Sequence, residues 1–164
     1  MNFIRLIPSV LLYKKKLVKG YKFKNHINVG KPNTTLLALE SQGADEIFLI
    51  DLFAYQIQTE FDYKALSDIS EKISTPITVG GNIKNFLQAK KLFANGADKI
   101  YLCSAYNKKN KDLFLQISDT FGSQSIVAGI NIKKFGNNYI TLDGKTDPLI
   151  LAKNYEKLGV GEIK

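Results

Sequence analysis

The sequence of 164 residues has one cysteine, no tryptophan and a single arginine, and these shortages exclude several classes of protein. Cys103 on its own can form neither an internal disulfide nor a cysteine-rich metal site. No apolar run approaches the roughly 20 residues of a membrane-spanning helix. The run from Ile7 to Tyr13 contains Pro8 and Ser9 and is too short for a signal peptide. Hydrophobic residues still make up 45% of the chain, so we expect one globular, cytoplasmic domain with a buried core.

The shortage of arginine also decides how the net charge of +8 is interpreted, because all 23 basic residues except Arg5 are lysines. Proteins that read nucleic acids rely on the forked guanidinium group of arginine, so we expect no nucleic-acid partner. Most of the lysines are expected on the solvated surface. Six of them fall within eleven residues, and this density is typical of a mobile loop over an anionic substrate or of a basic edge strand without a ligand: Lys14, Lys15, Lys16, Lys19, Lys22 and Lys24.

Short apolar runs alternate with amphipathic stretches along the chain. The pattern predicts strands over 4–10, 46–51, 76–79, 99–103, 125–130 and 162–163, helices over 32–41, 61–74, 85–95, 110–120 and 147–158, and a hairpin over 133–143. Strands that are apolar throughout pair in parallel and are covered by helices on both faces. A spacing of about 30 residues per unit fits a (β/α)8 barrel. It also fits a doubly wound sheet, and periodicity leaves both open.

A short motif that ends a helix and begins a strand occurs three times, in residues 43–46, 96–99 and 159–162. Its last residue is charged in each copy, and Arg5 holds a similar place on the first strand. In a closed barrel these two cations and two anions would meet at the amino ends of the strands. They would have to pair, because an unpaired desolvated charge costs several kcal/mol. The spacing alone favours a stabilising ion-pair plug on the barrel face that rarely carries function.

Several stretches, in order along nearly the whole chain, resemble the cyclase subunit of imidazole glycerol phosphate synthase, HisF. These stretches are residues 5–8, 17–20 with Phe23 and Asn25, 43–51, 76–81, 96–99, 121–124 and 159–163. The resemblance implies an α/β fold of the (β/α)8 TIM-barrel type. It covers the family's first five units and the start of the sixth strand, so residues 1–164 are expected to form one partial barrel domain. The segment Val10-Leu11-Leu12 looks closest to the family's surface-polysaccharide branch, in which ammonia amidinates a sugar.

The resemblance gives the four charged residues a functional role. Family members receive ammonia from a glutaminase through a gate of four charged residues, and all four types are kept here in Arg5, Glu46, Lys99 and Glu162. The resemblance therefore implies an ammonia gate and a class I, HisH-like glutaminase as the partner. An apolar barrel interior would pass neutral ammonia more readily than ammonium, because burying an unpaired charge is costly.

The catalytic end of the barrel departs from the family. The family has an aspartate at the end of the first strand and another at the end of the fifth, where this chain has Leu11 and Asn131. Neither side chain can exchange a proton as general acid–base catalysis requires. We therefore expect efficient cyclisation to be lost. The remaining candidate catalytic residues are Asn131, Asp51 and Lys19, the last on a loop that covers the substrate in the family.

The family's phosphate site is partly kept. Gly80, Gly81 and Asn82 follow the third strand, where backbone N–H groups could approach a phosphate, and Cys103 and Ser104 follow the fourth. For the two glycines the residues alone fit a tight turn equally well, and for Cys103 they favour a small buried hydrophobe. No metal or cofactor is expected.

These expectations lead to one preferred function and two alternatives. The preferred function is a HisF-like synthase subunit that delivers ammonia to a phosphorylated acceptor, a paralogue for surface-sugar amidination. The first alternative is a histidine-pathway cyclase, a lyase of the imidazole glycerol phosphate synthase type. The second is a non-catalytic half-barrel scaffold, whose open strand edges would favour a homodimer. The expected partners are a glutaminase and the acceptor, with neither nucleic acid nor a membrane among them.

Overall fold

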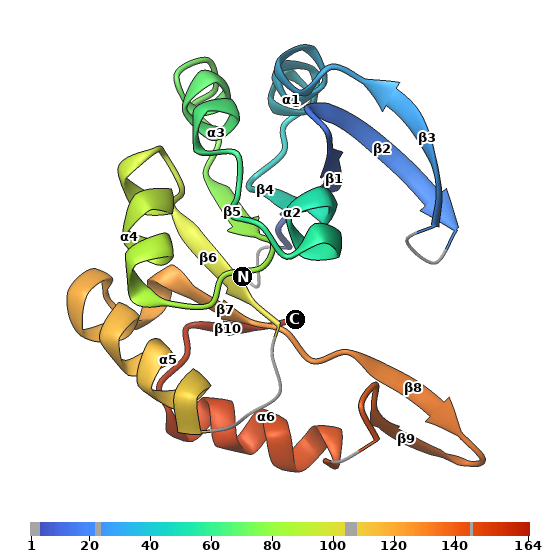
Figure 1. Ribbon diagram of the computed structural model, residues 1–164, viewed down its shortest axis with the longest axis vertical. Coiled ribbons are helices and arrows are strands. Elements are labelled where there is room, and N and C mark those ends of the chain that lie inside the picture. Colours follow the sequence, from blue (N-terminus) through green and yellow to red (C-terminus); the bar gives the residue numbers. More distant parts are fainter. Residues whose placement is uncertain (1–3, 22–23, 104–107, 145) are drawn as a thin grey trace. The chain divides into compact units, whose positions relative to one another are not determined.

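The computed structural model of the protein describes residues 4–21, 24–103, 108–144 and 146–164 (Figure 1). Ser104, one of the predicted phosphate-binding residues, lies outside the described residues. The chain divides into two compact units. Met1–Ile83 and Leu87–Ile100 form the first unit, and Lys84–Phe86 and Tyr101–Lys164 form the second. That the chain is one domain stays a prediction.

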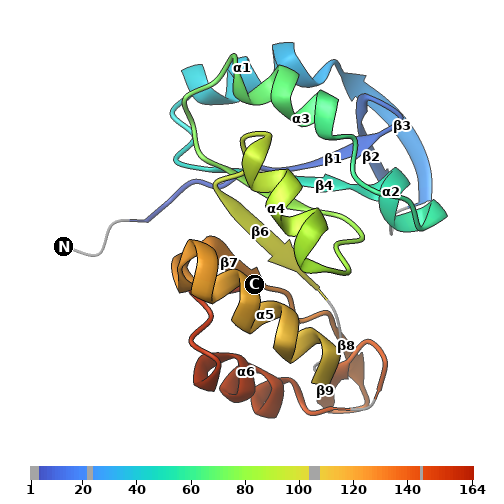
Figure 2. The same cartoon turned by 60° about the vertical axis from the view of Figure 1, so that its left-hand side comes forward.

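The first unit is built on parallel strands. Strand β4 (Ile47–Asp51) pairs in parallel with β1 (Ser9–Tyr13) on one side and with β5 (Ile77–Gly80) on the other. The start of β6 (Lys99–Leu102) lies next to β5 in the strand order. Helices α1 (Pro32–Ser41) and α3 (Tyr63–Ser70) lie side by side along this sheet (Figure 2). The apolar residues of β4 and β5 are buried, as expected for strands covered on both faces.

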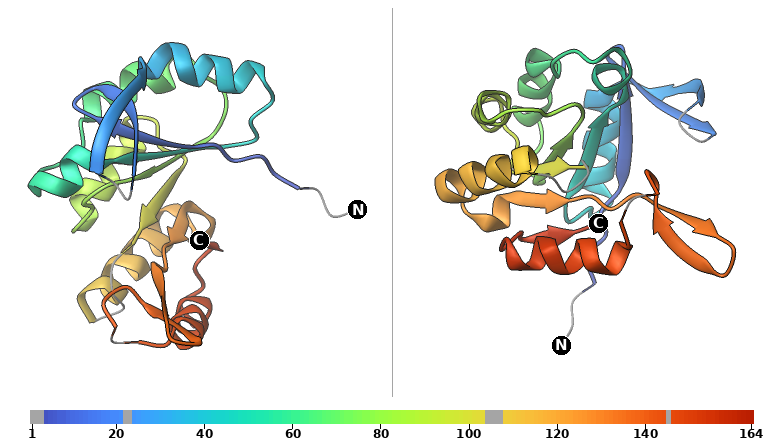
Figure 3. Two further views of the ribbon diagram at one scale, coloured as in Figure 1. Left: turned by 90° about the vertical axis from the view of Figure 1, so that its right-hand side faces the viewer. Right: turned by 60° about the horizontal axis from the view of Figure 1, so that its bottom comes forward.

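The lysine-rich segment forms edge strands. Strand β1 continues through a turn at Lys14 and Lys15 into β2 (Lys16–Tyr21), which pairs antiparallel with β3 (Lys24–Gly30). The hairpin projects from the sheet (Figure 3). Both turn residues are left-handed, with φ of 48° and 63°. This is the backbone of a two-residue hairpin turn, which normally carries glycine or asparagine.

Two predicted elements in the first unit have different bounds in the structure, and one helix was not predicted. The first strand was predicted from Ile4, but β1 begins at Ser9, because Pro8 has no N–H to donate to a strand partner. Helix α3 is shorter than the predicted helix over 61–74. A further helix, α2 (Leu52–Ile57), follows β4 directly and was not predicted. Its six residues are too few to show a helical period.

The second unit repeats the same parallel arrangement. Helix α5 (Lys108–Phe121) and the short helix η1 (Ser123–Ser125) precede β7 (Ile126–Ala128), and α6 (Pro148–Lys157) precedes β10 (Glu162–Ile163). Strand β10 pairs in parallel with β7, and Gly129 N donates a hydrogen bond of 2.8 Å to Leu102 O at the end of β6. The rings of Phe114 and Tyr155 pack 5.3 Å apart in the core. Helix α4 (Phe86–Ala94), nearly all of which belongs to the first unit, links β5 to β6.

The predicted hairpin over 133–143 is confirmed as β8 (Ile132–Phe135) and β9 (Asn138–Thr141) (Figure 3). The alternation of parallel strands with helices confirms the α/β, TIM-barrel-type architecture, truncated here. Among the described residues, β3 and β10 each have a strand partner on one side only, so the strands do not close into a ring.

Candidate functional site

Glu46 joins three other side chains at the amino ends of the strands of the first unit. Arg5 Nη1 lies 3.1 Å and Lys99 Nζ 2.7 Å from the same oxygen, Glu46 Oε2. Thr78 Oγ1 donates a hydrogen bond to the other carboxylate oxygen. The Glu46 side chain is only 4% exposed, so its charge depends on these partners rather than on water. We call Arg5, Glu46, Thr78 and Lys99 the Glu46 cluster.

The repeated sequence motif explains how this cluster is positioned. Asp45 Oδ2 accepts a hydrogen bond of 2.7 Å from Leu6 N, and Asp98 Oδ2 accepts one of 2.8 Å from Ile77 N. Each aspartate holds the backbone of the neighbouring strand segment, and the residue after it contributes its charge to the cluster. The motif therefore serves strand alignment and charge placement together.

Three of the four predicted gate residues lie in the Glu46 cluster. The fourth, Glu162, belongs to the second unit, where it begins β10 and pairs with Val127 of β7. Thr78 was not among the predicted site residues. Its signal in the sequence was a single hydroxyl within the apolar run 76–79, and only the folded structure shows that this hydroxyl contacts Glu46.

The inner face of the first unit carries mostly apolar side chains beyond the cluster. The strand register aligns Ser9, Phe48 and Thr78 in one row. It aligns Leu11, Ile50 and Gly80 in the next row towards the carboxyl ends. Leu11 therefore lies within β1, which continues to Tyr13, and not at the strand's end as predicted. Rows of this kind are how barrel interiors are filled.

Asp51 lies at the carboxyl end of β4 and is 4% exposed. Its Oδ1 accepts a hydrogen bond of 2.9 Å from Ala54 N, which caps α2. Burial raises the pKa of the Asp51 carboxyl above its ordinary value, although backbone N–H groups partly oppose the shift. Among the predicted catalytic residues, Asp51 is the one that can exchange a proton at a strand's carboxyl end.

The glycine segment after β5 packs against this aspartate. Gly81 has φ of 135°, and a Cβ there would lie 2.7 Å from the Asp51 carbonyl oxygen. Any side chain would collide with the backbone, so the close approach requires glycine. Asn82 Nδ2 donates a hydrogen bond of 2.8 Å to Thr59 O. These contacts favour the tight-turn interpretation of Gly80 and Gly81, and phosphate binding stays a prediction.

The other predicted site residues lie apart from these two groups. Lys19 is exposed on β2, opposite Ile27 of β3. Asn131 is exposed just before β8, and its carbonyl accepts a hydrogen bond of 2.7 Å from Leu142 N. The roles of both residues in catalysis stay predictions.

The expectation that Cys103 is a buried hydrophobe was wrong, because the thiol is exposed. Side chains alternate along β6, so Cys103 follows Lys99 and Tyr101 on one face, while Ile100 and Leu102 are buried on the other. Burial raises the pKa of the Tyr101 hydroxyl, and its interaction with the Cys103 thiol adds to the shift. Sequence reasoning did not single out Tyr101.

The fold and the charged strand ends define an α/β protein of the TIM-barrel type with its polar side chains at the ends of parallel strands. Comparison with protein families identifies which one: residues 5–163 match the family model described as histidine biosynthesis protein, and the chain belongs to that family.

Individual relatives agree with this assignment. The HisF subunit of imidazole glycerol phosphate synthase from Sulfolobus acidocaldarius is 38% identical over 169 residues, which cover 99% of this chain and 68% of the relative. Two proteins provisionally named imidazole glycerol phosphate synthase subunit hisF2 are also similar. The one from Campylobacter jejuni is 33% identical, covering 97% of this chain and 65% of the relative. The one from Pseudomonas aeruginosa is 34% identical, covering 97% and 66%. The chain thus spans about two thirds of the length of these relatives.

Proposed function

We propose that this chain is the HisF-type synthase subunit of a glutamine amidotransferase, which receives ammonia at the Glu46 cluster from a glutaminase partner. The observation that carries the proposal is the cluster itself: one buried carboxylate bridges two cations from separate strand segments. A simple ion pair, with one cation for one carboxylate, would stabilise the fold as well as this shared carboxylate does. A shared carboxylate additionally lets one cation move while the other keeps the carboxylate paired.

Lys99 is the cation suited to move. The Lys99 side chain is 18% exposed, and its ammonium group lies at the end of a flexible four-carbon stem. When this group moves away, Glu46 keeps its bonds to Arg5 and Thr78. Withdrawal of Lys99 Nζ opens a small polar entrance without stranding a buried charge. Neutral ammonia can then pass along the apolar inner face that Phe48 and Ile50 line.

The acceptor is proposed to differ from the histidine-pathway substrate. Leu11 and Asn131 stand where the family's resemblance places two aspartates, and neither can act as a general acid or base. Delivery of ammonia to a phosphorylated sugar for amidination requires a passage for ammonia but does not require the two aspartates. Two of the relatives carry hisF2 names, which supports a paralogue rather than the first HisF of its pathway.

The histidine-pathway cyclase remains the second candidate because of Asp51. Its raised pKa keeps a proton on a buried carboxyl group to higher pH, which suits proton exchange at the carboxyl end of a strand. A cyclase would use this group in place of the two missing aspartates.

One experiment separates the candidates. The full chain is combined with a HisH-type glutaminase, and both glutamine hydrolysis and consumption of the ribulosyl substrate with ammonium salt are measured. Ammonia delivery predicts faster glutamine hydrolysis while the ribulosyl substrate stays untouched. Glu46→Gln should remove the stimulation, whereas Glu71→Gln, at an exposed carboxylate of the same unit, should not. Consumption of the ribulosyl substrate would establish the cyclase function. If the glutaminase is not stimulated, the non-catalytic scaffold is the function that remains.

A further inference from the structure

The positive charge of this protein is concentrated in one short part of the chain. Residues 1–39 contain Arg5 and seven lysines but no aspartate or glutamate, whereas residues 40–164 contain 15 basic and 15 acidic residues. The first part therefore accounts for the whole net charge of +8. Basic residues gathered in one part of the chain attract an anionic partner.

Exposed apolar side chains lie on the β2–β3 hairpin within this basic part of the chain. Lys19 of β2 lies directly opposite Ile27 of β3, so these two side chains project from the same face of the hairpin. Tyr21 follows a shift of register after Lys19 and is also exposed. Tyr21 is 74% exposed and Ile27 60%, and the neighbouring Val29 is 49% exposed. We call these exposed side chains of the β2–β3 hairpin, Lys19, Tyr21, Ile27 and Val29, the outer hairpin face.

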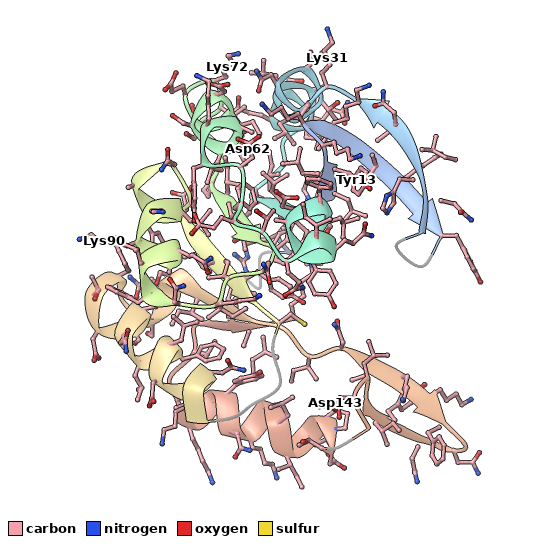
Figure 4. All side chains as sticks on the ribbon, in the orientation of Figure 1. Tyr13, Lys31, Asp62, Lys72, Lys90 and Asp143 are labelled. Carbon is pink, nitrogen blue, oxygen red and sulfur yellow. The ribbon has the colours of Figure 1, made fainter. Side chains whose placement is uncertain are left out.

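The opposite face of the hairpin is anchored. The His26 ring lies 4.5 Å from the Tyr13 ring, and the Tyr13 ring meets Phe53 of α2 edge-on at 5.4 Å. Lys14 Nζ lies 5.4 Å from the centre of the Phe53 ring. Tyr13 lies between the hairpin and α2 in Figure 4. Because these contacts hold one face against α2, the outer hairpin face stays open to solvent.

We propose that the outer hairpin face binds the surface of a membrane that contains anionic phospholipids. Lysine side chains are attracted by anionic headgroups, while a tyrosine and aliphatic side chains gain by entering the boundary between headgroups and acyl chains. A nucleic acid fits this face less well, because it offers nothing to the exposed Ile27 and Val29 and is normally read by arginine.

This binding is a surface contact. Among the described residues, no helix is long and apolar enough to span a bilayer. The expectation of no membrane partner was based on the absence of such a segment, and a surface contact requires none. The inference is independent of the proposed ammonia transfer, since it needs neither glutaminase nor acceptor.

Sedimentation of the full chain with lipid vesicles tests the inference. Binding is expected to vesicles of mixed phosphatidylglycerol and phosphatidylcholine, not to phosphatidylcholine alone, and to weaken with salt as charges are screened. Lys19→Gln should weaken binding about fivefold, the equivalent of about 1 kcal/mol per lysine at such a surface. The double variant Tyr21→Ser/Ile27→Ser should remove the part of the binding that persists at high salt.

Matched controls come from the charge-balanced part of the chain. Lys90→Gln changes an exposed lysine, and Tyr139→Ser/Ile132→Ser changes two exposed side chains, 60% and 52% exposed, on the β8–β9 hairpin. Neither control should alter vesicle binding. The inference is overturned by no binding to anionic vesicles or by equal losses in the controls. Tighter binding of a mixed-sequence oligonucleotide at the same salt would also overturn it.

Discussion

Replacing Glu46 by glutamine is expected to destabilise the protein strongly. The carboxylate is 4% exposed and lies within 3.1 Å of both Arg5 Nη1 and Lys99 Nζ. Glutamine keeps the shape and can still accept the hydrogen bond from Thr78, so the change removes charge and little else. Lys99, whose side chain is 18% exposed, then loses the carboxylate that lies 2.7 Å from its Nζ in a largely desolvated place.

The magnitude follows from the exposure of the two cations. Arg5 is 47% exposed and can turn to water, so its loss of a partner costs at most about 1 kcal/mol. Lys99 cannot recover its hydration in this way. Breaking a buried ion pair by removing one partner costs about 3–5 kcal/mol, and partial exposure of Lys99 places Glu46→Gln at about 3 kcal/mol. Lys99→Met should cost about 2 kcal/mol, because Glu46 keeps Arg5.

Urea unfolding at pH 7, followed by far-ultraviolet circular dichroism, measures these free energies through the midpoint at constant m-value. The double variant Glu46→Gln/Lys99→Met removes both members of the 2.7 Å ion pair together. The double variant should therefore be more stable than the sum of the single losses predicts, by about 2 kcal/mol. Glu71→Gln, an exposed carboxylate, should change stability by less than about 0.5 kcal/mol. A loss below about 1 kcal/mol for Glu46→Gln, or additive single losses, would refute the reasoning.

Three further predictions concern pH, a turn and a close contact. Because burial raises the pKa of Asp51, the folded state binds its proton more tightly than the unfolded chain does, and stability falls as pH rises through that interval. Asp51→Asn, which can still cap α2, should thus gain stability over the parent at neutral pH and lose this advantage below about pH 3 in urea titrations. Lys15→Gly should raise the free energy of unfolding by about 1 kcal/mol by relieving φ of 63°, whereas Lys16→Gly in β2 should lower it by a similar amount, as thermal unfolding can show. Gly129→Ala would place a Cβ 2.3 Å from Tyr101 Oη and should cost about 2 kcal/mol, but little in a Tyr101→Leu background, which a double-mutant cycle measures.

The strands that sequence analysis found are those whose pattern is local. Strands β4 and β5 are apolar throughout, which predicts burial on both faces without knowledge of their neighbours. Strand β2 has no such pattern, because its two lysines, Lys16 and Lys19, are separated by two apolar residues, and this spacing suits a loop equally well. Its hydrogen bonds come from β1 and β3, and these partners are set by a turn whose residues are lysines rather than glycine or asparagine. Helix α2 was missed for a related reason: the Asp51 cap that begins it was interpreted only as the end of a strand.

The residues of the candidate site also fall into those that the sequence identified and those that only the structure revealed. The repeated motif and the family resemblance identified Glu46 and Lys99 and the strand ends on which they lie. They did not identify Thr78 or Tyr101, because a hydroxyl within an apolar strand becomes significant only when the register shows what it faces. The burial of Cys103 was predicted wrongly because residue type suggests burial on average, whereas the face of the strand decides it in a particular fold.

The sequence by itself determined that this chain is built from alternating strands and helices, that it belongs with the HisF-like proteins, and that four of its predicted strands start at or near a charged residue. These properties depend on composition, period and short motifs, which are written along the chain. Only the tertiary structure decided that Arg5 and Lys99 share one oxygen of Glu46 and that the lysine-rich hairpin turns Tyr21 and Ile27 outward. Both depend on strand register, which is set by pairing between segments distant in sequence, and a shift of one residue would reverse every side chain.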